Sequence, residues 1–350
     1  MLLHSTTFEE RAEFLRRNVM DMPAGLTAES IAHPDADAIF DGLLHFRRFL
    51  LALFASPAAF RVDDDLESYH RLWDSVLFLN VAFARGELLR EGERAYLSID
   101  KGLIKRHFKK PAAFFLSTLS DFGFYFEYLK HGQYTNDYKK CDTLCIYNEN
   151  SSGIIFALSY LIERMPQVDS RKDYAMPTEL VLKADYASIL SEISPKRQDI
   201  DPLRADIRAT AGALCSVWEK LVPSLVGRGF NTACNFWTYC TPHWIVHFKK
   251  KSKTVCNLTL AADIVELDMT LPYEKGGAAA ALKPFLSEAA QGSLNKLGCI
   301  KCGRCDGGAV TMINGLALCP HEIWARRISF KLTSEADAES ALMLLDALAK

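Results

Sequence analysis

Apolar residues recur at helical spacing through the first third of the chain. The pattern predicts a helix over residues 8–20, a strongly apolar helix that ends before Pro57, and a longer helix over residues 66–89. Residues 21–35, between the first and the second of these helices, contain two prolines and a glycine, which interrupt helical structure. The N-terminal part of the chain is therefore expected to be rich in helices.

The pattern changes further along the chain. Two short helices are expected on either side of Pro111, and the alternating aromatic residues at 122–128 that follow them are typical of a strand. A polar loop then leads to a second predicted strand at 141–147. The order helix, helix, strand, loop, strand is that of a winged-helix module, so we expect such a module at about residues 100–165, at the end of a domain over residues 1–193.

A second domain is expected over residues 196–350. Its boundary falls at Ser194-Pro195, because the residue before a proline disfavours helix. Apolar and polar residues then alternate in three predicted strands, around 244–248, 256–260 and 265–271. This alternation indicates an antiparallel meander with one side facing solvent.

Further elements are expected towards the C-terminus. Residues 278–291 are predicted to form a helix that contains a proline, and Asn314-Gly315 supplies the positive φ angles of a hairpin turn. A last helix is expected over residues 334–349, with Ser334 as its cap and Asp337 at the N3 position. We therefore predict the α+β class, with a helix-rich N-terminal domain that has a winged-helix-like end, and a C-terminal antiparallel sheet flanked by helices.

Aromatic residues gather in the predicted C-terminal sheet. They are Trp237, Tyr239, Trp244 and Phe248. Large aromatic side chains line most ligand pockets. We expect these four residues to form the wall of a site that holds a small molecule or a protein partner, so that the expected function is binding rather than catalysis.

The amino-acid composition agrees with the predicted α+β class and excludes several other classes of protein. The chain has 350 residues, of which 49% are hydrophobic and 24% are charged, which excludes a mainly disordered or collagen-like chain. A net charge of −2 excludes a uniformly basic nucleic-acid-binding protein, but not a local basic patch. The first residues lack the features of a secretory signal, and the longest apolar stretch is too short for a membrane span. We expect a soluble, cytoplasmic protein of bacterial type without a membrane partner.

Four of the ten cysteines lie close together near the C-terminus. They are Cys299, Cys302, Cys305 and Cys319. A C-x2-C turn lets two thiolates converge on one ion, and the predicted hairpin returns Cys319 towards its own base, so the spacing predicts a structural zinc site. Two alternatives stay open: reduced thiols that bind nothing, and an iron–sulfur cluster, because Cys319-Pro320 follows a C-x2-C-x2-C run.

Basic residues gather before the predicted aromatic strand. They are Lys101, Lys105, Arg106, Lys109 and Lys110. Residues 101–140 contain eight Lys and Arg against three acidic residues. A winged helix uses such residues to contact DNA phosphates, which makes a DNA-binding regulator an alternative function. A solvated charged face explains the same residues without DNA.

Two residue groups keep an enzyme as a further alternative. Cys240 is close in the sequence to His243 and His247, as a nucleophilic cysteine with a neighbouring base requires. Glu266 and Asp268 point the same way from one predicted strand, about 7 Å apart, a separation at which two carboxylates flank a ligand. An aromatic core and a solvated strand face explain these residues without catalysis. The main nucleotide, zinc-protease and hydrolase motifs are absent from the sequence.

Four features of the C-terminal half occur together in a known group of domains. They are Trp218-Glu219 in a helix, the strand Trp244-x-Val246-x-Phe248-Lys249-x-Lys251, the strand from Thr254 to Leu260 and the terminal helix from Ser334 to Leu348. Over residues 196–350 the chain resembles the small bacterial α+β domains grouped as YdhG-like. The resemblance implies a curved antiparallel sheet with flanking helices and implies no catalytic residues. The segment from Cys299 to Cys319 departs from the pattern of that group.

Overall fold

The chain forms two compact units. The computed structural model describes residues 6–92, 94–108, 113–165, 175–190, 215–237, 242–251, 253–261, 264–300 and 310–349. One unit comprises residues 1–195 with 238–242, and the other comprises residues 196–237 with 243–350. Each unit combines helices with an antiparallel sheet, which confirms the predicted α+β class.

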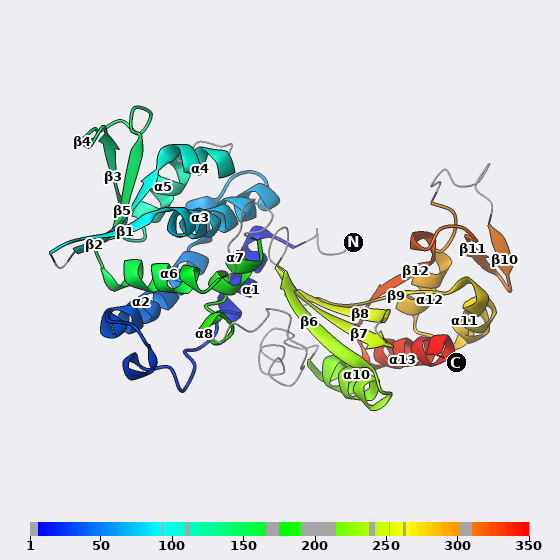
Figure 1. Cartoon of the computed structure of the whole chain (residues 1–350). Helices are drawn as coiled ribbons and strands as arrows, with labels where there is room; N and C mark the ends of the chain where they lie inside the picture. Colours follow the sequence, from blue (N-terminus) through cyan, green and yellow to red (C-terminus); the bar gives the residue numbers. More distant parts are fainter. Residues whose placement is uncertain are drawn as a thin grey trace. The chain divides into compact units, whose positions relative to one another are not determined.

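Apolar helices form the body of the N-terminal unit (Figure 1). The longer ones are α1 (Phe8–Arg17), α2 (Ala36–Ala55), α3 (Asp65–Arg85) and α6 (Gly153–Glu163). The shorter ones are α4 (Lys101–His107), α5 (Ala113–Ser120), α7 (Ala175–Leu182), α8 (Tyr186–Leu190), and the 3-10 turns η2 (Ala28–Ser30) and η3 (Pro57–Phe60). α6 packs against both α2 and α3. Because α3 and α6 also contact strands of the N-terminal unit, these helices cover one face of its sheet.

The predicted helix over residues 66–89 ends earlier than expected. α3 stops at Arg85, and Leu88 and Leu89 lie in the first strand instead. Gly86 permits the tight change of direction, since a Cβ there would lie 2.8 Å from the carbonyl oxygen of Ala82. The two leucines continue the apolar pattern of the helix, so periodicity alone does not reveal its end.

Five antiparallel strands form the sheet of the N-terminal unit. They are β1 (Glu87–Glu91), β2 (Arg94–Asp100), β3 (Phe124–Lys130), β4 (Gln133–Tyr134) and β5 (Thr143–Asn148), in the order β1-β2-β5-β3-β4. β3 and β5 confirm the two predicted strands, and α4 and α5 precede them in the expected order. The strands of this region share their sheet with β1 and β2, which the sequence pattern does not indicate.

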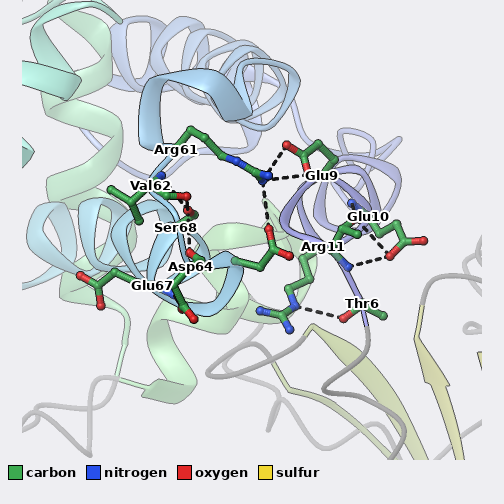
Figure 2. Close-up of polar contacts among 11 residues, drawn as sticks. Thr6, Glu9, Glu10, Arg11, Arg61, Val62, Asp64, Glu67 and Ser68 are labelled. Carbon is green, nitrogen blue, oxygen red and sulfur yellow. Dashed lines mark hydrogen bonds and ion pairs between the residues drawn. The ribbon is translucent and has the colours of Figure 1, made fainter.

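Side chains near η3 fix the start of α3 and connect it to α1 (Figure 2). Asp64 caps α3, because its carboxylate accepts a hydrogen bond of 2.6 Å from the backbone N–H of Glu67. The guanidinium of Arg61 lies 2.8 Å from a carboxylate oxygen of Glu9 in α1 and 3.0 Å from one of Asp65 in α3. One arginine thus joins the N-terminal turns of two helices, where carboxylates are favoured by the helix dipole.

The C-terminal unit is built around a second five-stranded antiparallel sheet. Its strands are β6 (Asn231–Trp237), β7 (His243–Lys250), β8 (Lys253–Ala261), β9 (Ile264–Thr270) and β12 (Arg327–Lys331), in the order β12-β9-β8-β7-β6. β7, β8 and β9 confirm the predicted meander. β10 (Thr311–Ile313) and β11 (Leu316–Leu318) form the predicted hairpin around Asn314-Gly315, both of which have positive φ.

Helices lie along one face of this sheet (Figure 1). They are α10 (Cys215–Gly227), α11 (Gly276–Leu282), α12 (Glu288–Asn295) and α13 (Glu335–Ala349), with the 3-10 turns η6 (Tyr273–Lys275), η7 (Lys283–Phe285) and η8 (Trp324–Arg326). The single helix predicted over residues 278–291 is wrong. The chain breaks at η7, because Pro284 has no N–H to continue the helical ladder.

Two of these helices are joined by ion pairs. α10 and α13 pack side by side, and Lys220 bridges Glu335 and Glu339 across them at 3.1 and 2.8 Å. The cap predicted for α13 is confirmed, since the Ser334 hydroxyl accepts a 3.3 Å hydrogen bond from the N–H of Asp337. α13 is therefore fixed at its N-terminus by the cap and along its exposed side by the ion pairs to α10.

Candidate binding site on the C-terminal sheet

Strand alternation gives the C-terminal sheet two different faces. On β7, Trp244, Val246 and Phe248 are buried in the core, whereas the intervening residues are half-buried on the opposite face. The same alternation continues through β6, β8, β9 and β12. The opposite face, which we call the polar face, carries Asn235, Trp237, His243, His247, Asn257, Thr259, Glu266, Asp268, Arg327 and Ser329.

His247 is held between two amide side chains on the polar face. Its Nε2 atom lies 3.0 Å from Nδ2 of Asn235 on β6, and its Nδ1 atom lies 2.7 Å from Oδ1 of Asn257 on β8. An amide nitrogen only donates, so it requires an unprotonated Nε2, and an amide oxygen only accepts, so it requires an Nδ1–H. The two amides therefore orient the ring across three strands.

The row of polar side chains continues through the other two strands. Asn257 is paired with Asp268 on β9, and Asp268 accepts two hydrogen bonds from the guanidinium of Arg327 on β12, one of them 2.7 Å from Nε to Oδ1. The two-pronged geometry fixes both side chains. Asn235, His247, Asn257, Asp268 and Arg327 therefore form an ordered polar row that crosses all five strands.

Two carboxylates and one guanidinium lie close together on the polar face. The hydrogen bond from Arg327 to Asp268, and the charges of Asp268 and Glu266, raise the pKa of Arg327 despite its partial burial. Glu266 is buried, with 8% of its surface exposed, and accepts a hydrogen bond from the hydroxyl of Ser329. The two acids on β9 are thus already engaged by partners on β12.

The four aromatic residues predicted to form one wall do not share a face. Trp244 and Phe248 have 1% and 0% of their surface exposed and belong to the core. Trp237 is 48% exposed and pairs with His243, which places it on the polar face. Tyr239 lies outside the described residues. The reason is that side chains alternate between the two faces along a strand. Trp237 shares the face of its partner His243, whereas Trp244 is the residue after His243 and points to the other face.

The predicted metal ligands are described only in part. Cys319 is buried directly after β11, and its sulfur accepts a hydrogen bond of 3.3 Å from the backbone N–H of Glu322. Cys299 is half-buried, and Cys302 and Cys305 lie outside the described residues. Within the described ranges no group of three or more His, Cys, Asp or Glu residues is placed to hold a metal ion. The zinc and iron–sulfur hypotheses stay predictions.

The residues considered for catalysis are described only in part. Glu266 and Asp268 project from the same strand face as predicted, but hydrogen bonds to Ser329 and Arg327 already hold them. Cys234 is fully buried on the core face, whereas His247 lies on the polar face. Cys240 lies outside the described residues. The alternative of a cysteine–histidine pair at Cys240 therefore stays a prediction.

The basic residues considered for DNA have different environments. Lys101 is buried, and its ammonium group donates hydrogen bonds to the carbonyl oxygens of Tyr138, Lys139 and Cys141, the last two at 2.9 and 3.1 Å. Lys101 therefore holds the turn before β5 rather than facing solvent. Lys105 and Arg106 are exposed on α4, and Lys109 and Lys110 lie outside the described residues.

No protein-family model, curated protein or solved structure matches the chain. The resemblance to YdhG-like domains therefore stays a prediction. Among the helices in the described ranges, none combines the length and the apolar character that crossing a bilayer requires.

Sequence reasoning missed most of the polar row. Asn235, Asn257 and Arg327 are ordinary polar residues at alternating strand positions, and nothing in their sequence context distinguishes them from solvated side chains. A signal was present in the alternation itself, which assigns them to one face. Their proximity depends on the register between strands, which alternation does not give.

Proposed function

We propose that this chain is a non-catalytic binding protein that holds a small polar molecule on the polar face of the C-terminal sheet. The observation that carries the proposal is the row from Asn235 to Arg327, in which hydrogen bonds fix Asn235, His247 and Asn257 as one group and Asp268 with Arg327 as another on the neighbouring strands. Polar groups fixed in advance lose little entropy when they bind a ligand. The expected site therefore moves from the aromatic face, which is in the core, to the opposite face.

The row retains groups that a ligand can use. His247 occupies the amide nitrogen of Asn235 and the amide oxygen of Asn257, which leaves the Asn235 oxygen to accept and the Asn257 nitrogen to donate. Trp237 stands on the same face with 48% of its surface exposed, and offers an apolar surface beside these polar groups. A molecule with a hydrogen-bond donor, an acceptor and a flat apolar part fits this chemistry.

The test is a titration of the isotope-labelled chain, followed by NMR of the asparagine side-chain amides. The probes are sets of dicarboxylates, amino acids, nucleosides and sugars. We expect one set to shift the side-chain amide signals of Asn235 and Asn257, and His247→Leu to weaken that binding at least tenfold. Lys253→Ala, at the exposed end of β8, is the matched control and is expected to bind normally. Probes that shift only signals elsewhere, or equal binding by His247→Leu, would contradict the proposal.

We further propose that Cys299, Cys302, Cys305 and Cys319 hold a structural zinc ion. The support is their spacing, together with the burial of Cys319 directly after the hairpin, where its sulfur accepts a hydrogen bond from the N–H of Glu322. Elemental analysis of the purified chain tests this, and one zinc per chain is the expected result. Iron with visible absorbance would favour the iron–sulfur alternative, and the absence of metal would reduce the four residues to ordinary thiols.

A further inference from the structure

The outward face of the N-terminal sheet carries a stack of an arginine and two tyrosines. The guanidinium carbon of Arg94 on β2 lies 3.8 Å from the centre of the Tyr147 ring on β5. The ring of Tyr125 on β3 lies parallel to that of Tyr147, with 5.6 Å between the centres and 19° between the planes. Because β2 and β3 flank β5, Arg94 and Tyr125 approach Tyr147 from its two neighbouring strands.

Each tyrosine of this stack has a carboxylate beside it. Glu127 lies 3.9 Å from the guanidinium of Arg94 and accepts a 2.9 Å hydrogen bond from the hydroxyl of Tyr134, and after burial its charge is the next cause that raises the pKa of Tyr147. Glu149, directly after β5, is close enough to Tyr125 to raise the pKa of its hydroxyl. Tyr147 and Glu127 therefore form a site for a guanidinium group, which we call the first place, and Arg94 occupies it. Tyr125 and Glu149 form another tyrosine–carboxylate pair one strand further, which we call the second place.

The second place is open. Tyr125 is 37% exposed and Glu149 is exposed, and Tyr147 is the ring that Tyr125 stacks on among the described residues. The next strand, β4, pairs only with Leu129 and Lys130 at the far end of β3, so it places no side chain opposite Tyr125. Among the described residues the stack thus ends at Tyr125, whose side chain keeps an exposed surface.

The charge of this face favours a cation. The register places Glu87, Glu91 and Glu127 on the same side as Arg94, with Glu149 at the end of the sheet. Four carboxylates thus accompany one guanidinium, and the carboxylates of Glu127 and Glu91 are close enough to raise the pKa of Tyr134. Acidic groups repel nucleic-acid phosphates, and attract a positively charged side chain.

We propose that Tyr125 and Glu149 bind the guanidinium group of an arginine side chain in a partner peptide. A planar guanidinium stacks on an aromatic ring and at the same time pairs with a carboxylate, as Arg94 does on Tyr147. An ammonium group lacks the flat surface for this, and a neutral urea group lacks the charge. The site is independent of the polar face of the C-terminal sheet.

The test uses NMR titration of the labelled full chain with a short glycine peptide that contains one arginine. Its matched probes contain citrulline or lysine in place of arginine, and free arginine is the fourth probe. A single exposed contact of this kind is weak, so we expect an affinity of about 1 mM. The arginine peptide is expected to shift the signals of Tyr125 and Glu149 and to bind at least fivefold more tightly than the citrulline peptide.

Variants separate this site from general attraction to an acidic surface. Tyr125→Leu is expected to weaken binding about tenfold and Glu149→Gln several-fold. Tyr134→Leu removes a tyrosine that is hydrogen-bonded to Glu127, beside the place that Arg94 occupies, and is expected to bind normally. Arg94→Ala vacates the first place, so the number of arginine peptides bound is expected to rise from one to two. Thermal unfolding of each variant checks that it is folded.

Four results would overturn the proposal. The first is equal binding of the arginine and citrulline peptides, and the second is equal loss in Tyr125→Leu and Tyr134→Leu. The third is a single bound peptide in Arg94→Ala, because the arrangement of Arg94 on Tyr147 would then not show how a partner's guanidinium group is bound. Free arginine that binds as tightly as the peptide would assign the place to a small ligand and would also overturn it.

Discussion

Gly42 in α2 lies so close to Gly153 in α6 that a Cβ on Gly42 would stand 1.9 Å from the carbonyl oxygen of Gly153. The obstacle is backbone, which cannot turn aside as a flexible side chain can. The two helices therefore cross at a separation that only glycine permits. This crossing positions α6, which packs on β2 and β5 of the N-terminal sheet.

Gly42→Ala is expected to lower the free energy of unfolding of the N-terminal unit by about 3 kcal/mol, at the upper end for overpacked cores. The control is Gly292→Ala in α12, where no atom lies within 4 Å of the added Cβ. Alanine favours helix over glycine, so the control is expected to be neutral or up to about 1 kcal/mol more stable. Urea unfolding followed by circular dichroism measures both. Equal stability of Gly42→Ala and wild type would show that the helices can separate without cost.

Lys101→Met is expected to destabilise the N-terminal unit by roughly 2–4 kcal/mol, because three carbonyl oxygens, that of Cys141 buried, lose a charged donor. Methionine keeps most of the apolar stem, so the change tests the ammonium group. Lys105→Met, one turn along α4 and exposed, is expected to change the unfolding free energy by less than about 0.5 kcal/mol. Equal effects of the two changes in urea unfolding would be inconsistent with the turn-holding role of Lys101.

Stability of the C-terminal unit is expected to depend on the ionisation of Asp337. Burial alone raises the pKa of Asp337, but hydrogen bonds from Ser287, Thr333 and Ser334 together lower it below its ordinary value. A carboxyl with a lowered pKa in the folded state contributes stability above its unfolded pKa of about 3.9, and loses it as the pH falls through the folded value.

Asp337→Asn is therefore expected to cost about 1 kcal/mol at pH 7, as loss of a helix cap does. The difference from wild type is expected to stay constant above about pH 5 and to shrink as the pH falls below about 4. Chemical unfolding across this pH range measures it, with Glu288→Gln on the exposed surface of α12 as the control. A difference that does not vary with pH would show that the charge of Asp337 is not involved.

Cys256 is expected to resist alkylation in the folded chain. Burial, and to a smaller extent the charge of Asp268, raises the pKa of Cys256 to about 12, and the residue is 1% exposed. At pH 8 only about one thiol in ten thousand would then be ionised. Thr259→Cys, which places a thiol on the polar face of the same strand, is expected to react with iodoacetamide at least about a hundred times faster. Mass spectrometry of the modified peptides measures both rates, and similar rates would contradict the buried position of Cys256.

The sequence predicted the individual helices and strands better than the contacts between them. Alternation in β7, β8 and β9 and the Asn314-Gly315 turn gave strands and a hairpin that the structure confirms, because these depend on neighbouring residues alone. The predicted element bounds were wrong in two places. At Leu88 and Leu89 the apolar pattern of a helix continued into a strand, and at Pro284 the apolar pattern favoured one continuous helix in spite of the proline. In both places a single backbone position decided the outcome.

The candidate site could be predicted only in part for a different reason. Strand periodicity already placed Glu266 and Asp268 on one face. It could not show that this face would also bring together Asn235, His247 and Asn257, which come from three strands whose register is set by turn lengths and core packing. Aromatic content likewise suggested a wall at Trp244 and Phe248, although helices cover that face.

By itself, then, the amino-acid order determined the α+β class, most strands and helices, and the cap of α13, since each follows from backbone preferences over a few residues. Tertiary structure alone decided which face of each sheet is covered, that Lys101 is enclosed by carbonyl oxygens, and that Arg94 lies on Tyr147. These relations join residues that are distant in the chain. They depend on how whole elements pack, and no short-range pattern contains that information.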